Sequence, residues 1–171
     1  MSETDVTSIW EAMLTEKIGG VAVYALVGDS DPKEEGERST ALIESVVPIE
    51  PDAAILDVGC GCGRVALVLA EKLGPEGRYL GVDIVPPLIG FATRHITSAF
   101  PNFEFRVRRQ ANTHYDHMME ADPDAPEIEA PPPKSFDLAI AFSLFTHLDA
   151  PEAAAVLQET AAAWTSEVTP G

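Results

Sequence analysis

Positively charged residues are scarce in this chain of 171 residues. Eleven lysines and arginines stand against 28 aspartates and glutamates, so the net charge is −17 at neutral pH. A surface of that sign repels the phosphate backbone of DNA or RNA. The compact basic group formed by Arg106, Arg108 and Arg109 is better explained as the solvated edge of a strand. We therefore expect no nucleic-acid partner.

Cysteines and long apolar runs are scarce as well. The two cysteines, Cys60 and Cys62, are separated by one residue, which is a poor spacing for a disulfide and too few ligands for zinc. No apolar run approaches the roughly 20 residues that span a bilayer. The first eight residues are polar and acidic, unlike a secretory leader. The sequence thus predicts a cytoplasmic protein with no disulfide, no metal site and no membrane partner.

The most distinctive stretch present is residues 55–64, Ile-Leu-Asp-Val-Gly-Cys-Gly-Cys-Gly-Arg. An apolar run contains Asp57 near its end and then breaks into three alternating glycines, Gly59, Gly61 and Gly63. Glycine permits a backbone with positive φ and leaves no Cβ in the way of a ligand. The pattern predicts a strand, a tight loop and a helix, with a ligand lying against bare main chain.

Strands and helices alternate along the rest of the chain. The expected strands cover residues 53–58, 78–83, 102–107 and 136–142, and the expected helices cover residues 37–47, 64–73, 86–96 and 150–164. Such alternation argues for a parallel α/β sheet with right-handed crossovers.

The remaining segments are expected to be connections and peripheral elements. Residues 1–50 form an N-terminal helical segment of the same domain, with residues 21–27 as either helix or strand and residues 28–36 as a loop. Residues 114–134 are rich in proline and acidic residues, so they predict a flexible surface insertion.

The ends of the predicted strands carry the residues that suggest a ligand. Parallel sheets bind ligands beyond the carboxyl ends of their strands, where Asp57, Asp83 and Ser143 fall. Asp83 follows the last glycine by about twenty residues, where a carboxylate can accept hydrogen bonds from both hydroxyls of a ribose. The ligand implied is an adenosine-type molecule.

Charge distinguishes two adenosine-type cofactors. NAD calls for Gly-x-Gly-x-x-Gly, but Arg64 stands where the third glycine belongs, and the carboxylate of Asp57 would repel a pyrophosphate. An ammonium or sulfonium group would suit that carboxylate. The charge argument therefore favours S-adenosylmethionine, with S-adenosylhomocysteine as its product.

Three stretches, residues 55–63, 81–83 and 135–148, resemble the motifs of class I S-adenosylmethionine-dependent methyltransferases. The resemblance implies a Rossmann-like, doubly wound and mostly parallel sheet. It implies that Asp57 and the glycines hold the methionine part, that Asp83 holds the ribose, and that Ile84 lies against the adenine. The expected cofactor-binding residues are Asp57, Gly59, Cys60, Gly61, Gly63, Asp83, Ile84, Gln110, Asn112 and Ser143.

Two site assignments remain open in the sequence. Either Gln110 or Asn112 would contact the adenine amino group. His147, which follows the fourth strand, is the candidate base for removing a proton from a hydroxyl acceptor. A helix-capping histidine is the structural alternative.

The chain departs from the resemblance in its length. The family's sheet continues into a fifth strand and a hairpin, whereas this sequence stops at Gly171, so residues 51–171 would form an incomplete core. A central strand would then be an exposed edge. A fragment is the favoured explanation; association through that edge with another chain, or marginal stability, are the others. The predicted function is SN2 methyl transfer to a small-molecule acceptor, and the alternative is a truncated, non-catalytic cofactor-binding or interaction module.

Overall fold

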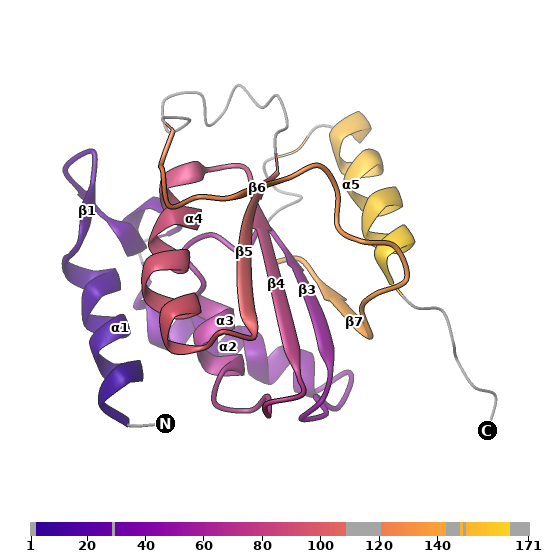
Figure 1. Ribbon diagram of the computed structural model, residues 1–171, viewed down its shortest axis with the longest axis horizontal. Helices are drawn as coiled ribbons and strands as arrows, with labels where there is room; N and C mark the ends of the chain where they lie inside the picture. The colour runs from indigo at the N-terminus through magenta and orange to yellow at the C-terminus, as the bar shows by residue number, and fades with distance from the viewer. Residues whose placement is uncertain (1–2, 29, 109–120, 143–147, 149, 165–171) are drawn as a thin grey trace.

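A five-stranded parallel sheet forms the centre of the computed structural model, which describes residues 3–28, 30–108, 121–142, 148 and 150–164 (Figure 1). The strand order is β6-β5-β4-β3-β7. The strands are β3 (Ala54–Val58), β4 (Arg78–Asp83), β5 (Phe103–Arg108), β6 (Glu127–Ile128) and β7 (Leu138–Ile140). This arrangement confirms the predicted α/β, Rossmann-like sheet.

The central strand, β3, is buried along its whole length. It pairs in parallel with β4, where Val58 lies opposite Val82, and with β7, where Asp57 lies opposite Ile140. Because both faces of a parallel sheet are covered, such strands are continuously apolar. The parallel register brings the carboxyl ends of β3, β4 and β7 to one edge of the sheet.

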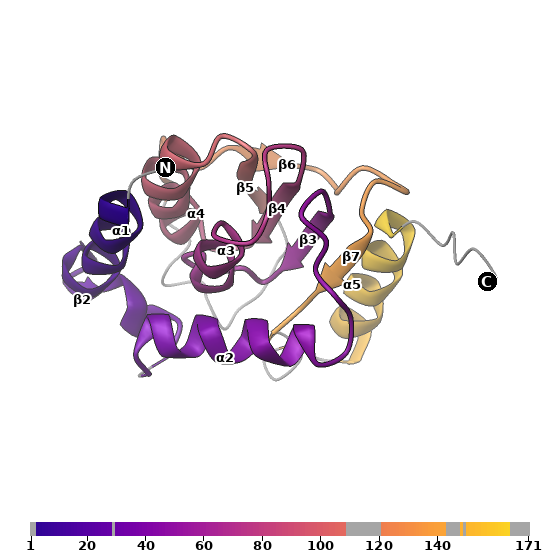
Figure 2. The ribbon, with the colours of Figure 1, turned by 90° about the horizontal axis from the view of Figure 1, so that it is seen from below.

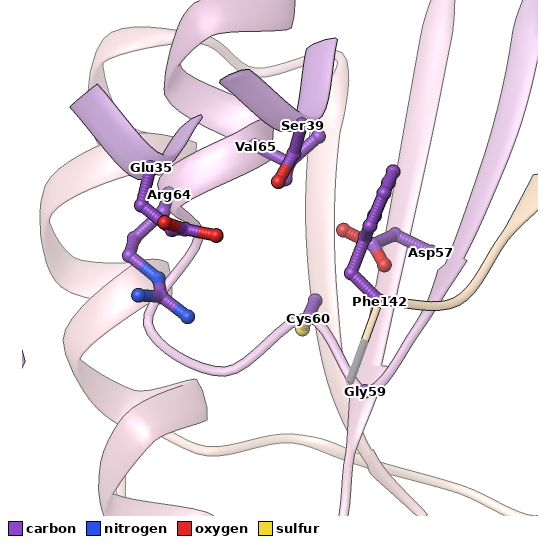
Figure 3. Close-up of a pocket in the computed structure, with 8 residues that line it drawn as sticks. All are labelled: Glu35, Ser39, Asp57, Gly59, Cys60, Arg64, Val65 and Phe142. Carbon is purple, nitrogen blue, oxygen red and sulfur yellow. The ribbon is translucent and has the colours of Figure 1, made fainter. Parts of the chain in front are cut away.

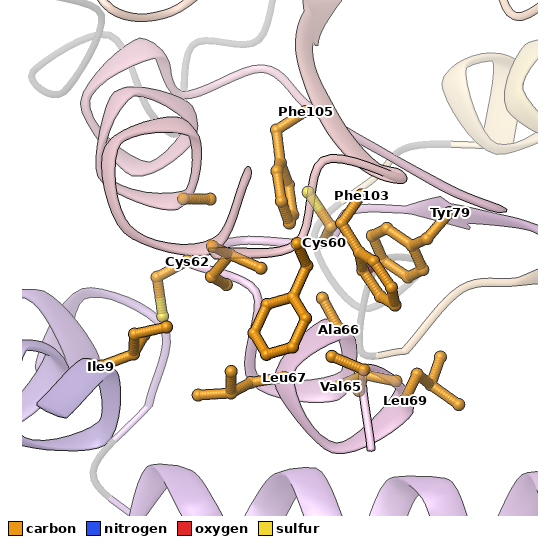
Figure 4. Close-up of a cluster of buried hydrophobic side chains, with 14 of the residues drawn as sticks. Ile9, Cys60, Cys62, Val65, Ala66, Leu67, Leu69, Tyr79, Phe103 and Phe105 are labelled. Atoms are coloured by element: carbon orange, nitrogen blue, oxygen red, sulfur yellow. The ribbon is translucent and has the colours of Figure 1, made fainter. Parts of the chain in front are cut away.

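One face of the sheet packs against the helices that follow β3 and β4 (Figure 2). Helix α3 (Arg64–Leu69) continues as a turn in which the Leu73 N–H donates to the Leu69 carbonyl at 2.9 Å. Helix α4 (Pro86–Ala92) runs directly into the π-helical turn η2 (Thr93–Thr97). Under these helices lie the stacked rings of Tyr79 and Phe103, with centroids 5.1 Å apart (Figure 4).

The N-terminal segment contains more than helices. After α1 (Glu3–Thr15), the strands β1 (Lys17–Ile18) and β2 (Val21–Ala22) form a small hairpin that leads into the 3-10 turn η1 (Val23–Leu26). Residues 21–27, for which helix and strand were both open, thus begin as strand and continue as a helical turn.

The predicted loop over residues 28–36 is wrong in its second half, because α2 (Pro32–Glu44) begins there. The Asp31 carboxylate accepts hydrogen bonds from the backbone N–H groups of Lys33 and Glu34, at 2.9 and 3.0 Å. A backbone N–H in the first turn of a helix has no partner within the helix, so the lack of an N–H on proline costs nothing there. Asp31 and Pro32 together therefore start the helix five residues earlier than predicted.

The predicted insertion over residues 114–134 is also partly wrong. Its described part, from residue 121, packs on the fold: β6 extends the sheet beside β5, with Val107 opposite Glu127. Arg94 of η2 contacts Asp122 at 3.3 Å. The chain then crosses in front of the sheet from β6 toward β7 (Figure 1).

The other face of the sheet is covered by α5 (Ala150–Ala163), which buries Val156 and Ala163. Beyond β7, Phe136 and Trp164 form an isolated parallel bridge, and the described residues contain no further strand at that edge. Among the helices that the structure describes, none has the length and apolar character needed to cross a membrane.

Candidate functional site

The glycine loop after β3 is held against the end of β4 by backbone hydrogen bonds. The Val82 carbonyl accepts from Gly59 N–H at 2.8 Å and from Cys60 N–H at 3.2 Å. The Gly61 N–H donates to Asp83 Oδ2 at 2.9 Å. These hydrogen bonds hold the loop against the end of β4, as a preorganised ligand site requires.

Gly63 is required by both backbone conformation and packing. Its φ of +88° is left-handed, and it precedes the first residue of α3. A Cβ at this position would lie 2.5 Å from Ile96 Cδ1 and 3.4 Å from Phe105 Cε1. The left-handed conformation favours glycine at this position, and a side chain would also require Ile96 to shift.

Asp57 is a buried acid next to the loop, with 3% of its surface exposed. The Tyr79 hydroxyl donates a hydrogen bond to Asp57 Oδ2 at 2.5 Å. Burial raises the pKa of Asp57 from 3.8 to about 7; the Tyr79 hydrogen bond opposes this rise, the charge of Asp83 adds to it, and the charge of Arg64 opposes it. Asp57 would thus be stabilised as a carboxylate by any cation that enters beside it.

Asp83 joins the loop to the next helix. Its Oδ1 accepts the Val85 N–H at 3.0 Å, and its Oδ2 accepts the Gly61 N–H. Burial raises the pKa of Asp83, while hydrogen bonds from the backbone N–H groups of Val85, Gly61 and Ile84 act to lower it. A carboxylate oxygen can accept more than one hydrogen bond, so the oxygens of Asp83 can still accept hydrogen bonds from a ligand.

The two cysteines behave as small buried residues. Both are free thiols inside the main hydrophobic cluster. Burial raises the pKa of Cys60 well above its ordinary value and that of Cys62 to about 12, so both remain protonated. A Cβ on Gly81 would lie 2.8 Å from Cys60 Sγ, so the sulfur fills the space that this glycine leaves on β4. In the described part of the chain no group of three or more His, Cys, Asp or Glu residues is placed to hold a metal ion.

A pocket opens between the glycine loop, α2, α3 and the segment after β7 (Figure 3). Its lining consists of Glu35, Ser39, Asp57, Gly59, Cys60, Arg64, Val65 and Phe142. Three of the predicted cofactor residues, Asp57, Gly59 and Cys60, are among them.

The other predicted residues stand elsewhere. Gly61, Gly63 and Asp83 belong to the loop or contact it but are not among the residues that line this pocket, and Ile84 packs against the main hydrophobic cluster. Gln110, Asn112, Ser143 and His147 lie outside the described residues, so their assignments stay predictions.

Sequence reasoning missed Glu35, Ser39 and Phe142 as pocket residues and treated Arg64 only as a departure from the NAD pattern. One signal was available: the Asp-Pro start of α2 would have placed Glu35 and Ser39 four residues apart on one helical face. Phe142 enters through the fold, because β7 lies beside β3.

Comparison with known proteins decides the family of the chain. Residues 49–167 match the family described as "Methyltransferase domain". The chain belongs to this methyltransferase family. The match confirms the resemblance to class I S-adenosylmethionine-dependent methyltransferases.

Individual relatives of this methyltransferase chain are similar over short stretches. Nocamycin O-methyltransferase of Saccharothrix syringae is 44% identical over 48 residues, which are 28% of this chain and 17% of that protein. The chain spans between 15% and 28% of the length of the first four curated relatives that it matches.

Solved structures share the fold of this methyltransferase. A cyclopropane-fatty-acyl-phospholipid synthase-like protein of Lactobacillus casei has a TM-score of 0.56 at 21% identity, covering 95% of this chain and 55% of that one. Phosphoethanolamine N-methyltransferase 1 of Haemonchus contortus, solved with phosphoethanolamine and S-adenosylhomocysteine, has a TM-score of 0.56 at 18% identity, covering 96% and 30%. At these identities the likeness shows the fold alone.

Proposed function

We propose that this chain binds S-adenosylmethionine in the pocket beside the glycine loop and serves methyl transfer to a small-molecule acceptor. The observation that carries the proposal is the position of Asp57, a buried acid that lines a pocket together with Gly59 and Cys60 of the loop. A carboxylate in such surroundings is stabilised by a nearby cation, and the cofactor has both an ammonium and a sulfonium group.

The residues around the loop fit the rest of that cofactor. Gly59 presents main chain without a side chain to the pocket. The oxygens of Asp83 retain acceptor capacity for the two ribose hydroxyls, and Ile84 follows directly as an apolar neighbour for the adenine. NAD would instead place a pyrophosphate near Asp57, where the two negative charges would repel each other.

The contribution of the protein to methyl transfer would be mainly positional. The cofactor supplies a methyl group already activated by the sulfonium. The pocket's part is to hold the reacting groups in line and to exclude water. The Phe142 ring, drawn beside Asp57 in Figure 3, adds an aromatic face of the kind that attracts cations. The proposed base for a hydroxyl acceptor remains His147.

The acceptor is proposed to be a small molecule without strong negative charge. The net charge of −17 disfavours a polyanionic acceptor. Arg106 is paired with Glu104 at 2.8 Å and Arg108 with Glu159, so the described part of the basic group is locally neutralised. We also keep self-association through the β7 edge as a hypothesis that sedimentation velocity would check.

Calorimetric titration with S-adenosylhomocysteine and, separately, with NAD tests the proposal. We expect binding of the first ligand and not of the second. Asp83→Ala should weaken that binding about tenfold to a hundredfold, because it removes charged hydrogen-bond acceptors. Asp52→Asn, at an exposed turn, is the matched control and should bind like the original chain. Binding of NAD alone, or undiminished binding by the Asp83→Ala variant, would contradict the proposal.

A second measurement distinguishes an enzyme from the alternative, a cofactor-binding module without turnover. The same preparation would be supplied with labelled S-adenosylmethionine and a panel of small hydroxyl and amine acceptors. Ligand binding without any label transfer would favour the module for this chain in isolation.

A further inference from the structure

Two oppositely charged residues, Glu35 of α2 and Arg64 of α3, line the same pocket as Asp57 (Figure 3). In the close-up they stand on the side of the pocket opposite Asp57 and Phe142. Neither residue belongs to the glycine loop or to the acidic strand end that indicated the cofactor. Their presence in the pocket is a consequence of how α2 packs on α3.

The close approach of the two helices fixes this placement. A Cβ on Gly36 would lie 2.5 Å from the Arg64 carbonyl oxygen, so α2 crosses α3 with backbone almost in contact. Glu35 precedes that crossing and therefore lies near Arg64. The Arg64 Nη2 donates to the Val27 carbonyl at 3.0 Å, which anchors one end of the guanidinium. A guanidinium has five N–H donors, so several remain for a ligand.

These opposite charges do not neutralise each other. Among the described residues, Glu35 has its ion pair with Arg38 of the same helix at 3.4 Å, and no ion pair joins it to Arg64. Arg38 has 71% of its side chain exposed, so this pair is weak. The hydrogen-bond partner of Arg64 is a neutral carbonyl. Within the described part of the chain, the guanidinium of Arg64 and the carboxyl groups of Asp57 and Glu35 thus line one pocket without a direct ion pair between them.

The charges of the pocket are the reverse of those on the methionine part of the cofactor. The pocket offers two carboxylates, Asp57 and Glu35, and one guanidinium, Arg64. The ligand part has two cationic groups, the sulfonium and the α-ammonium, and one α-carboxylate. Guanidinium and carboxylate form strong, geometrically specific hydrogen bonds.

We propose that Arg64 binds the α-carboxylate and Glu35 the α-ammonium of the cofactor's amino-acid tail, so that α2 and α3 supply charged contacts to the tail in addition to Asp57 and the glycine loop, while Asp83 recognises the ribose. This assignment rests on the proposed function. It makes Arg64 and Glu35 determinants of specificity for the complete cofactor over nucleosides that lack the tail.

Titration with two ligands tests the assignment: S-adenosylhomocysteine, which has the tail, and 5′-methylthioadenosine, which lacks it. Arg64→Gln should weaken binding of S-adenosylhomocysteine about tenfold to a hundredfold, the range for a hydrogen bond to a charged group, and that of methylthioadenosine less than about twofold. Arg64→Lys should restore part of the loss. Glu35→Gln should show the same selectivity with a smaller loss.

Matched controls exist on the same helix. Lys33→Gln removes an exposed ammonium, and Glu37→Gln removes the exposed carboxylate that pairs with it; neither Lys33 nor Glu37 lines the pocket. Both controls should bind the two ligands like the original chain. Thermal unfolding of each variant checks that the Val27 contact of Arg64 is not needed for folding.

The outcomes separate this inference from the function on which it rests. If the original chain binds neither ligand, the proposed function fails. If it binds both, and Arg64→Gln and Glu35→Gln weaken both ligands equally or neither, only the tail assignment fails. Equal loss would show that Arg64 supports the loop through Val27 and does not contact the tail.

Discussion

The two faces of the central sheet differ in how deeply they are packed. On the face of the glycine loop, Leu67 of α3, Ile89 of α4 and Ile96 of η2 are completely buried. On the opposite face, α5 buries only Val156 and Ala163, while Leu157 is 55% exposed. The strands follow the same division: β3 is buried throughout, whereas β7 contributes three residues and buries one of them.

This difference in packing indicates which parts of the molecule should open least readily. Local opening costs the least free energy where few apolar groups are buried and the most beneath a dense core. The loop proposed to hold the cofactor stands over the dense face, so it is preorganised for binding. The β7 and α5 region lies beside the same pocket through Phe142 but has much less packing to hold it in place.

The comparison is tested most directly by two leucines that undergo the same substitution. Leu67→Ala on α3 should lower the free energy of unfolding by about 3 to 5 kcal/mol, because it leaves a cavity in a closed core. Leu157→Ala on α5 should change it by less than about 0.5 kcal/mol. Urea denaturation gives both values. Comparable losses at both sites would mean that the two faces are equally packed.

Hydrogen exchange extends that test to the backbone. Amides of β3 and β4 should exchange more slowly than those of β7 and α5 under native conditions. Fast exchange in β3, or equal protection of all four elements, would remove the basis of the comparison.

The dense face also contains Asp57, a buried acid whose ionisation lowers the stability of the fold, so stability should depend on pH. Asp57 has a pKa of about 7 in the fold, against 3.8 for the ordinary residue. Below about pH 4 the group is protonated in both folded and unfolded chains, and its full contribution to stability is present. As pH rises toward 7 the unfolded chain ionises first, so stability is lost by at most about 4 kcal/mol. Above that pH the loss levels off.

Asp57→Asn isolates this contribution. Relative to the original chain, the variant should become progressively more stable between about pH 4 and 7, as measured by urea denaturation at each pH. The variant should retain a smaller dependence of stability on pH, because the pKa of Asp83 is also raised. Asp52→Asn, on an exposed turn, should leave the pH profile unchanged. A stability difference that is flat across this range would show that Asp57 is not buried as an acid.

Two glycines with nearly the same φ allow the packing of the glycine loop to be compared with that of the N-terminal hairpin. Gly63 has φ +88° and Gly20 of the N-terminal hairpin has φ +87°. A Cβ on Gly20 meets nothing within 4 Å, whereas one on Gly63 collides with Ile96. Gly20→Ala should therefore lose about 1 kcal/mol from the left-handed conformation alone. Gly63→Ala should lose about 2 to 3 kcal/mol because overpacking is added.

Equal losses for these two alanine variants in urea denaturation would contradict the packing role of Gly63. They would show that Ile96 moves aside at no cost and that conformation alone requires the glycine.

The sequence predicted elements on both faces closely: α5 ends one residue before its predicted bound, whereas α3 ends at Leu69 and not at residue 73. The strand at 78–83 has the predicted bounds, and β3 begins one residue later than predicted. Both are short buried runs that end near an acid, and the glycines between them are a local signal. The helix predicted over residues 86–96 is present as α4 and the π-helical turn η2.

What the sequence did not reveal depends on contacts between distant segments. Gly36 argued for a loop, but the structure needs glycine there because α2 crosses the Arg64 backbone. β6 has two residues and exists only through its pairing with β5, which no local pattern encodes. Glu35, Arg64 and Phe142 were missed as pocket residues for the same reason, because they come from segments far apart in the sequence.

The smallest predicted effect concerns the hydroxyl that supports Asp57. Tyr79→Phe keeps the ring stacked on Phe103 and removes only the hydrogen bond to the carboxylate. We expect a loss of about 1 kcal/mol in the free energy of unfolding. Because that hydrogen bond lowers the pKa of Asp57 in the fold, its removal should also extend the decline in stability to higher pH, while the start of the decline, set by the unfolded chain, stays in place.

Tyr24→Phe, on the partly exposed turn η1, is the matched control and should change neither quantity. If Tyr79→Phe lowers stability while the pH at which the decline ends stays fixed, the hydroxyl packs against Asp57 without governing its charge. The rigid face would then position its acid by burial alone, and cofactor affinity in the Tyr79→Phe variant would keep the pH dependence of the original chain.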